Sequence, residues 1–212
     1  PSAAITKIRK YTLDLYKELE KEVDHSAGLR LNGALSIAQN KGRWQELQRQ
    51  ATTAQLYDVD VRILDKGQIK KNYPIINTDE VIGGILMPGD GAADPSGVTH
   101  MLAKGARKHG AQIFEKSPVD EILTKDGKIS GVKVNGHKID CEYIVLASGM
   151  WSRQIGEKSG VSIPLYPAEH FYIITEPIEN LSKTLPVVRD FDNRTYIKED
   201  AGKILVGIFE GN

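Results

Sequence analysis

The segment Tyr143–Ser152, YIVLASGMWS, constrains the fold of this chain more than any other stretch. Within it, Ile144–Ala147 is an uninterrupted apolar run, which is typical of a strand buried on both faces of a parallel sheet. The run ends at Ser148-Gly149, and small residues at the carboxyl end of such a strand let a ligand approach the backbone. The segment predicts a ligand-binding edge of an α/β sheet or, more simply, a core strand followed by a turn.

Composition narrows the classes of partner. The 212 residues include 28 Lys+Arg and 28 Asp+Glu, so the formal net charge is zero. This balance argues against nucleic acid or an anionic membrane as the partner. No apolar stretch approaches the roughly 20 residues that a membrane-spanning helix needs. Cys141 is the single cysteine, which excludes an internal disulfide framework and a cysteine-based metal cluster, and we expect no metal site and a cytoplasmic location.

Helices and strands alternate in the first third of the chain, which indicates mixed α/β packing. Apolar residues recur at spacings of three and four in the amphipathic segments, and β-branched residues mark the strands. The predicted order is a helix over Ile5–Val23, a strand or hairpin over Leu29–Ala38, a helix over Arg43–Tyr57, a strand over Val59–Leu64 and a short helix over Asp65–Tyr73.

A glycine-rich region follows at Val81–Pro95. Gly83-Gly84 inside an apolar run predicts a bulge or a close approach by another backbone or a ligand. Pro88–Gly91 predicts a tight turn, in which Asp90 belongs either to a structural turn or to a loop beside the substrate. Asp94-Pro95 predicts the start of a helix that ends near Gly110. No GxGxxG or Walker-type phosphate loop is present.

The second half of the chain is rich in predicted strands. The Asp-Gly and Asn-Gly pairs at 126–127 and 135–136 predict hairpin turns between the members of a three-stranded antiparallel meander. The predicted strands are Gln112–Glu115, then Val119–Thr124, Ile129–Val134 and Lys138–Ile139 of the meander, then Val161–Tyr166, Glu169–Thr175, Pro186–Arg189, Thr195–Lys198 and Ile204–Phe209. Alternation places His170 and Tyr172 on one face of their strand.

Several short motifs, in their order and spacing, resemble the D-amino-acid-oxidase-like flavoproteins, and most of all the dimethylglycine and sarcosine dehydrogenases. They are Pro88–Gly91 with Asp94-Pro95, Ala147–Ser152, then Pro164, Pro167, His170 and Tyr172, and Leu185–Val187 with Arg189-Asp190. The resemblance implies a mixed α/β and α+β fold, in which a partial FAD-binding dinucleotide fold with a β-meander is interwoven with a large antiparallel substrate-binding sheet. Residues 1–28 and 96–160 would belong to the FAD-binding domain, and residues 29–95 and 161–212 to the substrate-binding domain.

The resemblance also implies an activity. Enzymes of this kind oxidise the N–CH₃ carbon of a methylated amino acid, such as dimethylglycine or sarcosine, by hydride transfer to FAD. The resulting iminium hydrolyses or passes its carbon to tetrahydrofolate, which would bind a domain outside this chain. In a eukaryote the expected location is the mitochondrial matrix. Two alternatives stay open, namely an amino-acid oxidase of the same superfamily acting on glycine or D-amino acids, and a non-catalytic binding module without cofactor.

Site residues follow from the positions that match the family. The expected cofactor-binding residues are Val119, Ala147, Ser148, Gly149 and Trp151. The expected catalytic residues are His170 and Tyr196, and the expected substrate-binding residues are Tyr172 and Thr195. A neutral imidazole at His170 suits proton transfer from an ammonium substrate, although a histidine hydrogen-bonded in a sheet is the simpler interpretation.

Two departures from the family, at the tyrosine pair and at the FAD-binding fingerprint, limit these expectations. Thr195-Tyr196 stands where the dimethylglycine branch has a pair of tyrosines, which leaves the exact substrate open. Arg189, whose fork of donors suits a carboxylate, is interpreted as an ion pair at a strand edge. The GxGxxG fingerprint, the acidic residue after it and the histidine that tethers FAD in some members are absent. We therefore expect a central piece of a longer polypeptide that by itself binds FAD weakly or not at all and is inactive.

Overall fold

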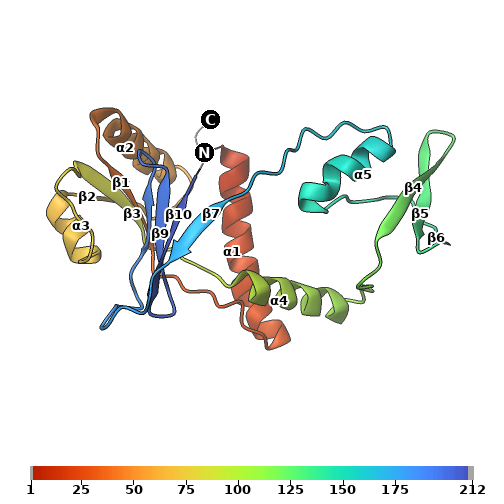
Figure 1. The fold of residues 1–212 in the computed structure, drawn as a ribbon, viewed down its shortest axis with the longest axis horizontal. Helices are drawn as coiled ribbons and strands as arrows, with labels where there is room; N and C mark the ends of the chain where they lie inside the picture. Colours follow the sequence, from red (N-terminus) through yellow and green to blue (C-terminus); the bar gives the residue numbers. More distant parts are fainter. Residues whose placement is uncertain (1, 210–212) are drawn as a thin grey trace. The chain divides into compact units, whose positions relative to one another are not determined.

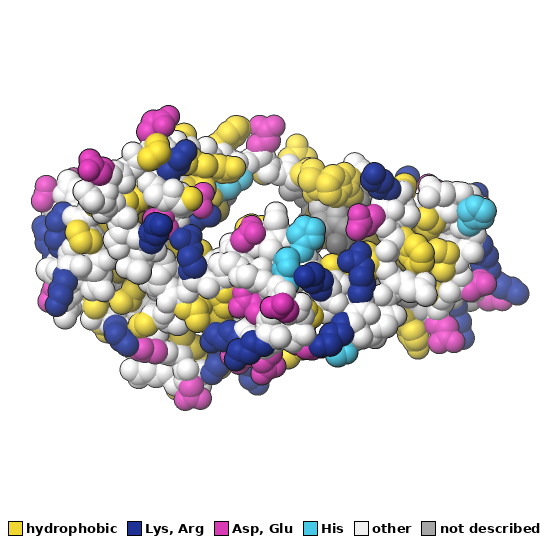
Figure 2. Space-filling model, turned by 90° about the horizontal axis from the view of Figure 1, so that it is seen from below, with side chains coloured by type: hydrophobic (Ala, Val, Ile, Leu, Met, Phe, Trp, Pro, Cys, Tyr) yellow, Lys and Arg dark blue, Asp and Glu magenta, His cyan; other side chains and the backbone are white. Residues whose placement is uncertain are grey.

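The computed structural model describes residues 2–209 and divides the chain into two compact units (Figure 1). The large unit comprises residues 1–111 and 170–212, and the small unit comprises residues 112–169. Each unit has its own sheet. Acidic and basic side chains are interspersed on the face drawn in Figure 2, in keeping with the balanced charge of the sequence.

A seven-stranded sheet forms the centre of the large unit, in the order β2-β3-β1-β8-β9-β10-β7. Its strands are β1 (Ala34–Ala38), β2 (Arg62–Leu64), β3 (Gly83–Met87), β7 (Phe171–Ile174), β8 (Val187–Asp190), β9 (Thr195–Asp200) and β10 (Lys203–Ile208). Every pairing is antiparallel except that of β1 with β8. The expected large, mostly antiparallel sheet is therefore confirmed.

Four helices accompany this sheet, and each begins at a polar cap. They are α1 (Ala3–Val23), α2 (Lys41–Gln55), α3 (Lys66–Asn72) and α4 (Pro95–Lys108). Asp94 accepts hydrogen bonds from the amides of Ser96 and Gly97, and Pro95 occupies the first turn, as the sequence predicted. Asp65 and Gln68 form a reciprocal capping box at α3.

The two faces of the sheet are covered differently. Ile69 of α3 packs on the face that carries Leu35 and Val188, and Leu47 of α2 packs on the opposite face beside Ile85. The backbones of both helices lie over β1, β2 and β3, and no helix backbone among the described residues lies close to β7, β8, β9 or β10. The α2 face of β8, β9, β10 and β7 is therefore uncovered within the large unit, and we call it the open half.

The glycine pair in β3 serves close packing, and the register of β1 with β3 shows no bulge. A Cβ at Gly83 would lie 2.8 Å from the ring of Trp44, and a Cβ at Gly84 would lie 2.6 Å from the Ser36 carbonyl oxygen. The close-approach alternative is confirmed, because both faces of β3 are packed too tightly for a side chain at these positions.

Helices α1 and α4 pack against each other around Leu19, Ala27 and Met101. A Cβ at Gly105 would lie 2.8 Å from a methyl group of Leu19, so the glycine lets the two helices approach closely. No helix among residues 2–209 is long and apolar enough to cross a membrane.

The small unit contains the predicted meander, with β4 (Val119–Lys125), β5 (Lys128–Val134) and β6 (His137–Ile139) in an antiparallel sheet. Its two turns have positive φ at both central residues, at 126–127 and at 135–136, as the Asp-Gly and Asn-Gly pairs predicted. A 3₁₀ turn, Gly149–Trp151, leads into α5 (Ser152–Lys158).

Three strand predictions are wrong, and of the two alternatives for Leu29–Ala38 the structure supports the strand and not the hairpin. Ile144–Ala147, Gln112–Glu115 and Val161–Tyr166 are irregular, and Val145 is 90% exposed. A buried strand needs paired neighbours for its backbone N–H and C=O groups, and no described strand pairs with these segments. Leu29–Ala38 contributes only a five-residue strand, because its partners β3 and β8 come from distant parts of the chain rather than from a local turn.

Candidate functional site

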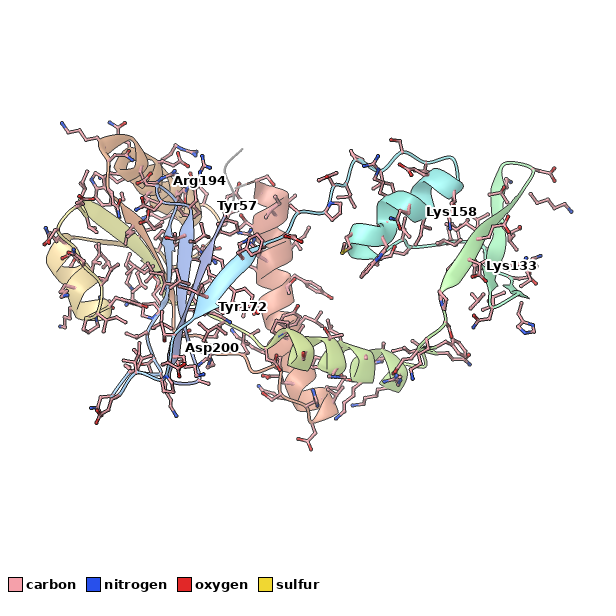
Figure 3. All side chains as sticks on the ribbon, viewed as in Figure 1. Tyr57, Lys133, Lys158, Tyr172, Arg194 and Asp200 are labelled. Carbon is pink, nitrogen blue, oxygen red and sulfur yellow. The ribbon has the colours of Figure 1, made fainter. Side chains whose placement is uncertain are left out.

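The open half carries a row of side chains set by strand register. Arg189 on β8 pairs with Tyr196 on β9, Tyr196 pairs with Gly207 on β10, and Gly207 pairs with Tyr172 on β7. Directly paired residues point to the same face. Figure 3 labels Tyr172 on β7, where its side chain is 56% exposed. The row therefore brings residues from four strands onto one uncovered surface.

Next to this row, His170, Tyr196 and Phe209 form a ring cluster. The Nε2 atom of His170 lies 3.2 Å from the Tyr196 hydroxyl oxygen. The rings of His170 and Tyr196 are nearly parallel, and their centroids are 5.7 Å apart. The centroid of the Phe209 ring lies 4.9 Å from that of His170 and 5.6 Å from that of Tyr196. The structure thus brings together the two side chains that the sequence predicted to be catalytic.

Gly207 explains how the ring of Tyr196 reaches His170. A Cβ at Gly207 would collide with the Tyr196 ring, so the ring lies across β10 in the space that a side chain would fill. Strands in a sheet are about 4.8 Å apart. A tyrosine on β9 can therefore touch a residue next to β7 only by lying over the intervening strand.

The histidine–tyrosine pair has the chemistry of a proton acceptor with an orienting partner. His170 is exposed, so a small substrate has access to its ring. Its Nε2 is hydrogen-bonded to Tyr196, and the tyrosine hydroxyl can donate to a neutral imidazole or accept from it. An imidazole fixed in this way has the geometry of a proton acceptor for a small substrate.

Arg189 is the cationic side chain of the row, and Asp90 faces it. Their Nη2 and Oδ2 atoms are 3.5 Å apart, and both side chains are partly exposed. The other carboxylate oxygen of Asp90 accepts a hydrogen bond from the Gly91 amide at 2.8 Å, which fixes the turn. The ion pair predicted for Arg189 is present, but β8 is the fourth of seven strands, so its location at a strand edge is wrong.

Thr195 does not join this row. It pairs with Asp190 and Ile208 and directly precedes Tyr196 on β9. Because side chains alternate along a strand, Thr195 points to the face opposite that of Tyr196. Its role in substrate binding stays a prediction.

The predicted cofactor residues all belong to the small unit. Ala147, Ser148 and Gly149 lie in the irregular segment before the 3₁₀ turn, and Val119 begins β4. A Cβ at Gly149 would have nothing within 4 Å, and its φ is +54°. A small, open backbone of this kind fits the close approach of a flat cofactor such as FAD.

Trp151 lines a hollow in the small unit with a volume of about 290 Å³. Met150, Arg153 and Tyr166 also line it, and the side chains of Trp151 and Tyr166 are exposed. The hollow offers aromatic surface, and its cation Arg153 is paired with Glu157, which also lines it, at 2.9 Å. The aromatic lining suits a ring-bearing ligand, and the cofactor contact at Trp151 stays a prediction.

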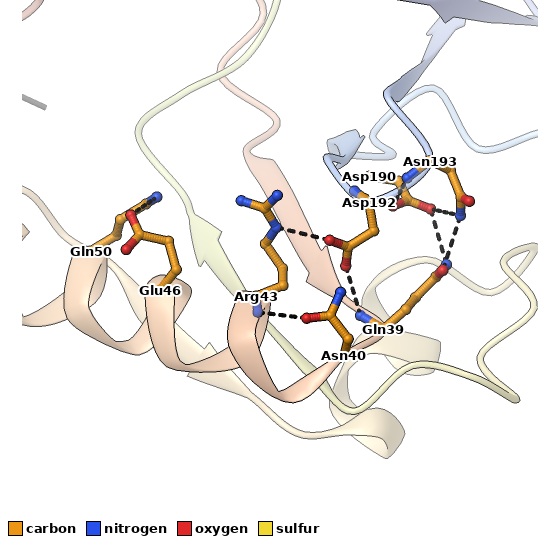
Figure 4. Close-up of polar contacts among 8 residues, drawn as sticks. All are labelled: Gln39, Asn40, Arg43, Glu46, Gln50, Asp190, Asp192 and Asn193. Atoms are coloured by element: carbon orange, nitrogen blue, oxygen red, sulfur yellow. Dashed lines mark hydrogen bonds and ion pairs between the residues drawn. The ribbon is translucent and has the colours of Figure 1, made fainter. Parts of the chain in front are cut away.

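A polar network supports the turn between β8 and β9 (Figure 4). Asp190 accepts hydrogen bonds from the amides of Asp192 and Asn193 and from the side chain of Gln39 at 3.0 Å. Arg43 of α2 donates to Asp192 at 3.1 Å. The network ties the β8–β9 turn to the start of α2 and so fixes the strands that carry Arg189 and Tyr196.

Sequence reasoning missed Gly207, Phe209 and the contact between Asp90 and Arg189. Alternation within the last strand would have placed Gly207 and Phe209 on one face. The pairing of β9, β10 and β7 and the approach of the Asp90 turn to β8 depend on tertiary structure, and no local signal marks them.

Comparisons with known proteins identify the family of the chain. Residues 1–212 match the family described as FAD dependent oxidoreductase (DAO). The chain is 35% identical over 209 residues to 4-methylaminobutanoate oxidase (formaldehyde-forming) from Paenarthrobacter nicotinovorans, covering 99% of this chain and 25% of that protein. It is 33% identical over 201 residues to mitochondrial sarcosine dehydrogenase from Homo sapiens, covering 92% of this chain and 22% of that protein. The chain thus spans about a quarter of these relatives.

Another relative, which is named as a regulatory subunit and not as an oxidase or dehydrogenase, also matches along the whole chain. The mitochondrial pyruvate dehydrogenase phosphatase regulatory subunit from Mus musculus is 31% identical over 214 residues, covering 100% of this chain and 24% of that protein. Among solved structures, L-proline dehydrogenase from P. horikoshii superposes with a TM-score of 0.86 at 26% identity, covering 95% of this chain and 54% of that one.

Proposed function

This chain belongs to the family of FAD-dependent oxidoreductases, and we propose that it supplies the substrate-binding sheet of an enzyme that oxidises the N–CH₃ group of a methylated amino acid. The hydrogen-bonded pair of His170 and Tyr196 on the open half carries this proposal. Relatives named for 4-methylaminobutanoate and sarcosine support it, since both compounds are N-methylated amino acids.

The residues of the open half have distinct tasks in this proposal. An amine can give up hydride only in its neutral form, so His170 accepts the ammonium proton and Tyr196 orients the imidazole. Phe209 and Tyr172 supply apolar surface around the amine. When bound, FAD supplies the two-electron acceptor for the hydride.

The division of roles along the chain follows from the same proposal. All seven strands of the large sheet lie within residues 29–95 and 161–212, which supports the assignment of these ranges to substrate binding. The meander, the Ala147–Gly149 segment and α5 lie within 96–160, and we assign this range, with residues 1–28, to the FAD side.

Anaerobic mixing of the FAD-loaded full-length protein with a panel of amines tests the proposal. Sarcosine, dimethylglycine and 4-methylaminobutanoate are expected to bleach the flavin absorbance, and glycine and D-alanine are not. His170→Ala is expected to slow flavin reduction roughly 100-fold or more, because it removes the proton acceptor. The free energy of unfolding is expected to stay the same, since the side chain is exposed.

His137→Ala is the matched control, because His137 is an exposed strand histidine in the small unit. Equal rates for the wild type and both variants would remove His170 from the mechanism. Bleaching by glycine or D-alanine alone would identify another amino-acid oxidase of the superfamily.

A second candidate function is a regulatory module without redox activity, favoured by the match to a phosphatase regulatory subunit along the whole chain. The same experiment separates the two candidates. A full-length protein that holds FAD but is reduced by no amine of the panel would favour the regulatory module.

A further inference from the structure

We propose that Asp190 is a positioning residue for the proposed reaction, because it shapes the β8–β9 turn that holds Tyr196 and Phe209 against His170. This inference rests on the proposed function and extends it to a residue outside the open half. Asp190 closes the hairpin by pairing with Thr195, and both side chains point to the face opposite that of Tyr196. Asp190 therefore acts on the ring cluster only through the backbone of the turn.

The Asp190 carboxylate is buried, and both of its oxygens accept hydrogen bonds. One oxygen accepts from the backbone amides of Asp192 and Asn193, both at 3.1 Å. The other accepts from the side chains of Gln39 at 3.0 Å and Asn193 at 2.8 Å. Three of these bonds lie within the turn, and the fourth joins the turn to the residue directly after β1 (Figure 4). Without the carboxylate, all four donors lose this acceptor, so the turn is no longer held in its conformation.

Arg194, the last residue of this turn, connects the turn to both aromatic residues. Its φ is +54°, a left-handed conformation that residues other than glycine rarely adopt. Its carbonyl accepts a hydrogen bond from the Phe209 amide at 2.8 Å. Tyr196 follows Arg194, which Figure 3 labels, by two residues. If the turn relaxes from this conformation, the Arg194 carbonyl moves, and Phe209 and Tyr196 move with it.

The ring cluster is sensitive to such a movement. Tyr196 and Phe209 both contact the ring of His170, which precedes β7 and is not part of the turn. The distance from His170 Nε2 to the Tyr196 hydroxyl oxygen is 3.2 Å, at the long end of the range for hydrogen bonds. A displacement of Tyr196 by about 0.5 Å is therefore enough to lose this bond. Misplacement on this scale slows a reaction that depends on the orientation of the imidazole.

The test measures flavin reduction by sarcosine in the FAD-loaded full-length protein. Asp190→Ala is expected to lower the maximal rate roughly tenfold and to leave the KM within about twofold, because the side chain points away from the substrate face. Asp190→Asn, which keeps one acceptor oxygen for the two turn amides, is expected to retain most of the rate. Asp200→Ala is the matched control, and no change is expected. Asp200 closes the next hairpin at the other end of β9, and its side chain has no hydrogen-bond or ion-pair partner among residues 2–209.

A double-mutant cycle separates positioning from a general loss of structure. In Tyr196→Phe, which lacks the hydroxyl, the addition of Asp190→Ala is expected to change the rate by less than about threefold. A loss that stays roughly tenfold in that background would overturn the action through Tyr196. Gln39→Leu removes only one of the four donors and takes the place of Asp190→Ala in the cycle if that variant does not fold. A loss of roughly threefold is expected from Gln39→Leu.

Modification of His170 by diethyl pyrocarbonate supplies a readout that needs no turnover. The reagent acylates imidazole nitrogens, and the hydrogen bond to Tyr196 shields Nε2. In the full-length protein, mass spectrometry is expected to show roughly two- to fivefold faster modification of His170 in Asp190→Ala and in Tyr196→Phe, and no change in Asp200→Ala. Equal rates of modification in the wild type and Asp190→Ala would overturn the positioning role. Faster modification without flavin reduction by any amine would overturn the proposed oxidation alone.

Discussion

At the scale of single residues, Gly207 decides where the Tyr196 ring can lie. We predict that Gly207→Ala destabilises the chain by about 1–3 kcal/mol, because the new methyl group overlaps the ring. Urea unfolding of the variant measures this loss. The hydrogen bond of Tyr196 to His170 should be broken as well, since the ring must move.

Gly89→Ala is the matched control for this prediction. A Cβ at Gly89 has nothing within 4 Å, so the free energy of unfolding should change by less than about 0.5 kcal/mol. If Gly207→Ala is as stable as Gly89→Ala, the packing of Tyr196 over β10 is not as tight as described.

The sequence predicted part of the site at this scale. Alternation put His170 and Tyr172 on one face, and the register of β7 with β10 and the contacts of the His170 ring agree with that prediction. The structure adds the contact between His170 and Tyr196, and the catalytic role of each, which was expected from the family and not from local pattern, stays a prediction. The two side chains meet only when β9, β10 and β7 lie next to one another in the sheet, and no short-range signal in the sequence specifies this strand order.

At the scale of elements, one ion pair ties the segment before β1 to the end of β9. Arg30 Nη1 lies 2.6 Å from Glu199 Oε2, and the Gly202 amide donates to the other oxygen at 2.7 Å. Burial raises the pKa of Glu199, but the Gly202 amide and Arg30 together outweigh burial and hold the pKa below its usual 4.5. The ionised form is therefore the one that the fold favours.

We predict that this carboxylate contributes stability above about pH 4.5, which is lost as the pH falls through its lowered pKa. The sign follows because the unfolded state binds the proton more tightly. Glu199→Gln should therefore cost about 1–3 kcal/mol at neutral pH, and the difference from the wild type should vanish in acid. Unfolding curves measured from pH 7 to pH 3 check this. Asp60→Asn, in an exposed pair, should show no such pH dependence.

The strand predictions that were wrong belong to this scale too. An apolar run such as Ile144–Ala147 has the composition of a buried strand, yet a strand exists only where a neighbour pairs with it. Alternation and turn residues identified the meander because its partners are adjacent in sequence. The parallel pairing of β1 with β8 had no comparable signal, since more than 140 residues separate the two strands.

At the scale of the whole molecule, the family resemblance drawn from the sequence is confirmed along all 212 residues. We predict that residues 1–212 expressed alone retain little FAD, because the sequence has no GxGxxG loop to hold the pyrophosphate. Gel filtration after incubation with FAD should give a colourless protein peak. Stoichiometric flavin absorbance in that peak would show that the small unit holds the cofactor without such a loop.

The parallel pairing of β1 with β8 also has a consequence for biosynthesis. Residues 34–37 pair with residues 187–190, so β1 has an unpaired edge until the later strand has left the ribosome. At roughly 5–20 residues per second, the wait lasts about 8–30 s. During that interval the nascent chain presents the unpaired backbone N–H and C=O groups of residues 34–37 at a sheet edge, which is the kind of edge that holdase chaperones protect.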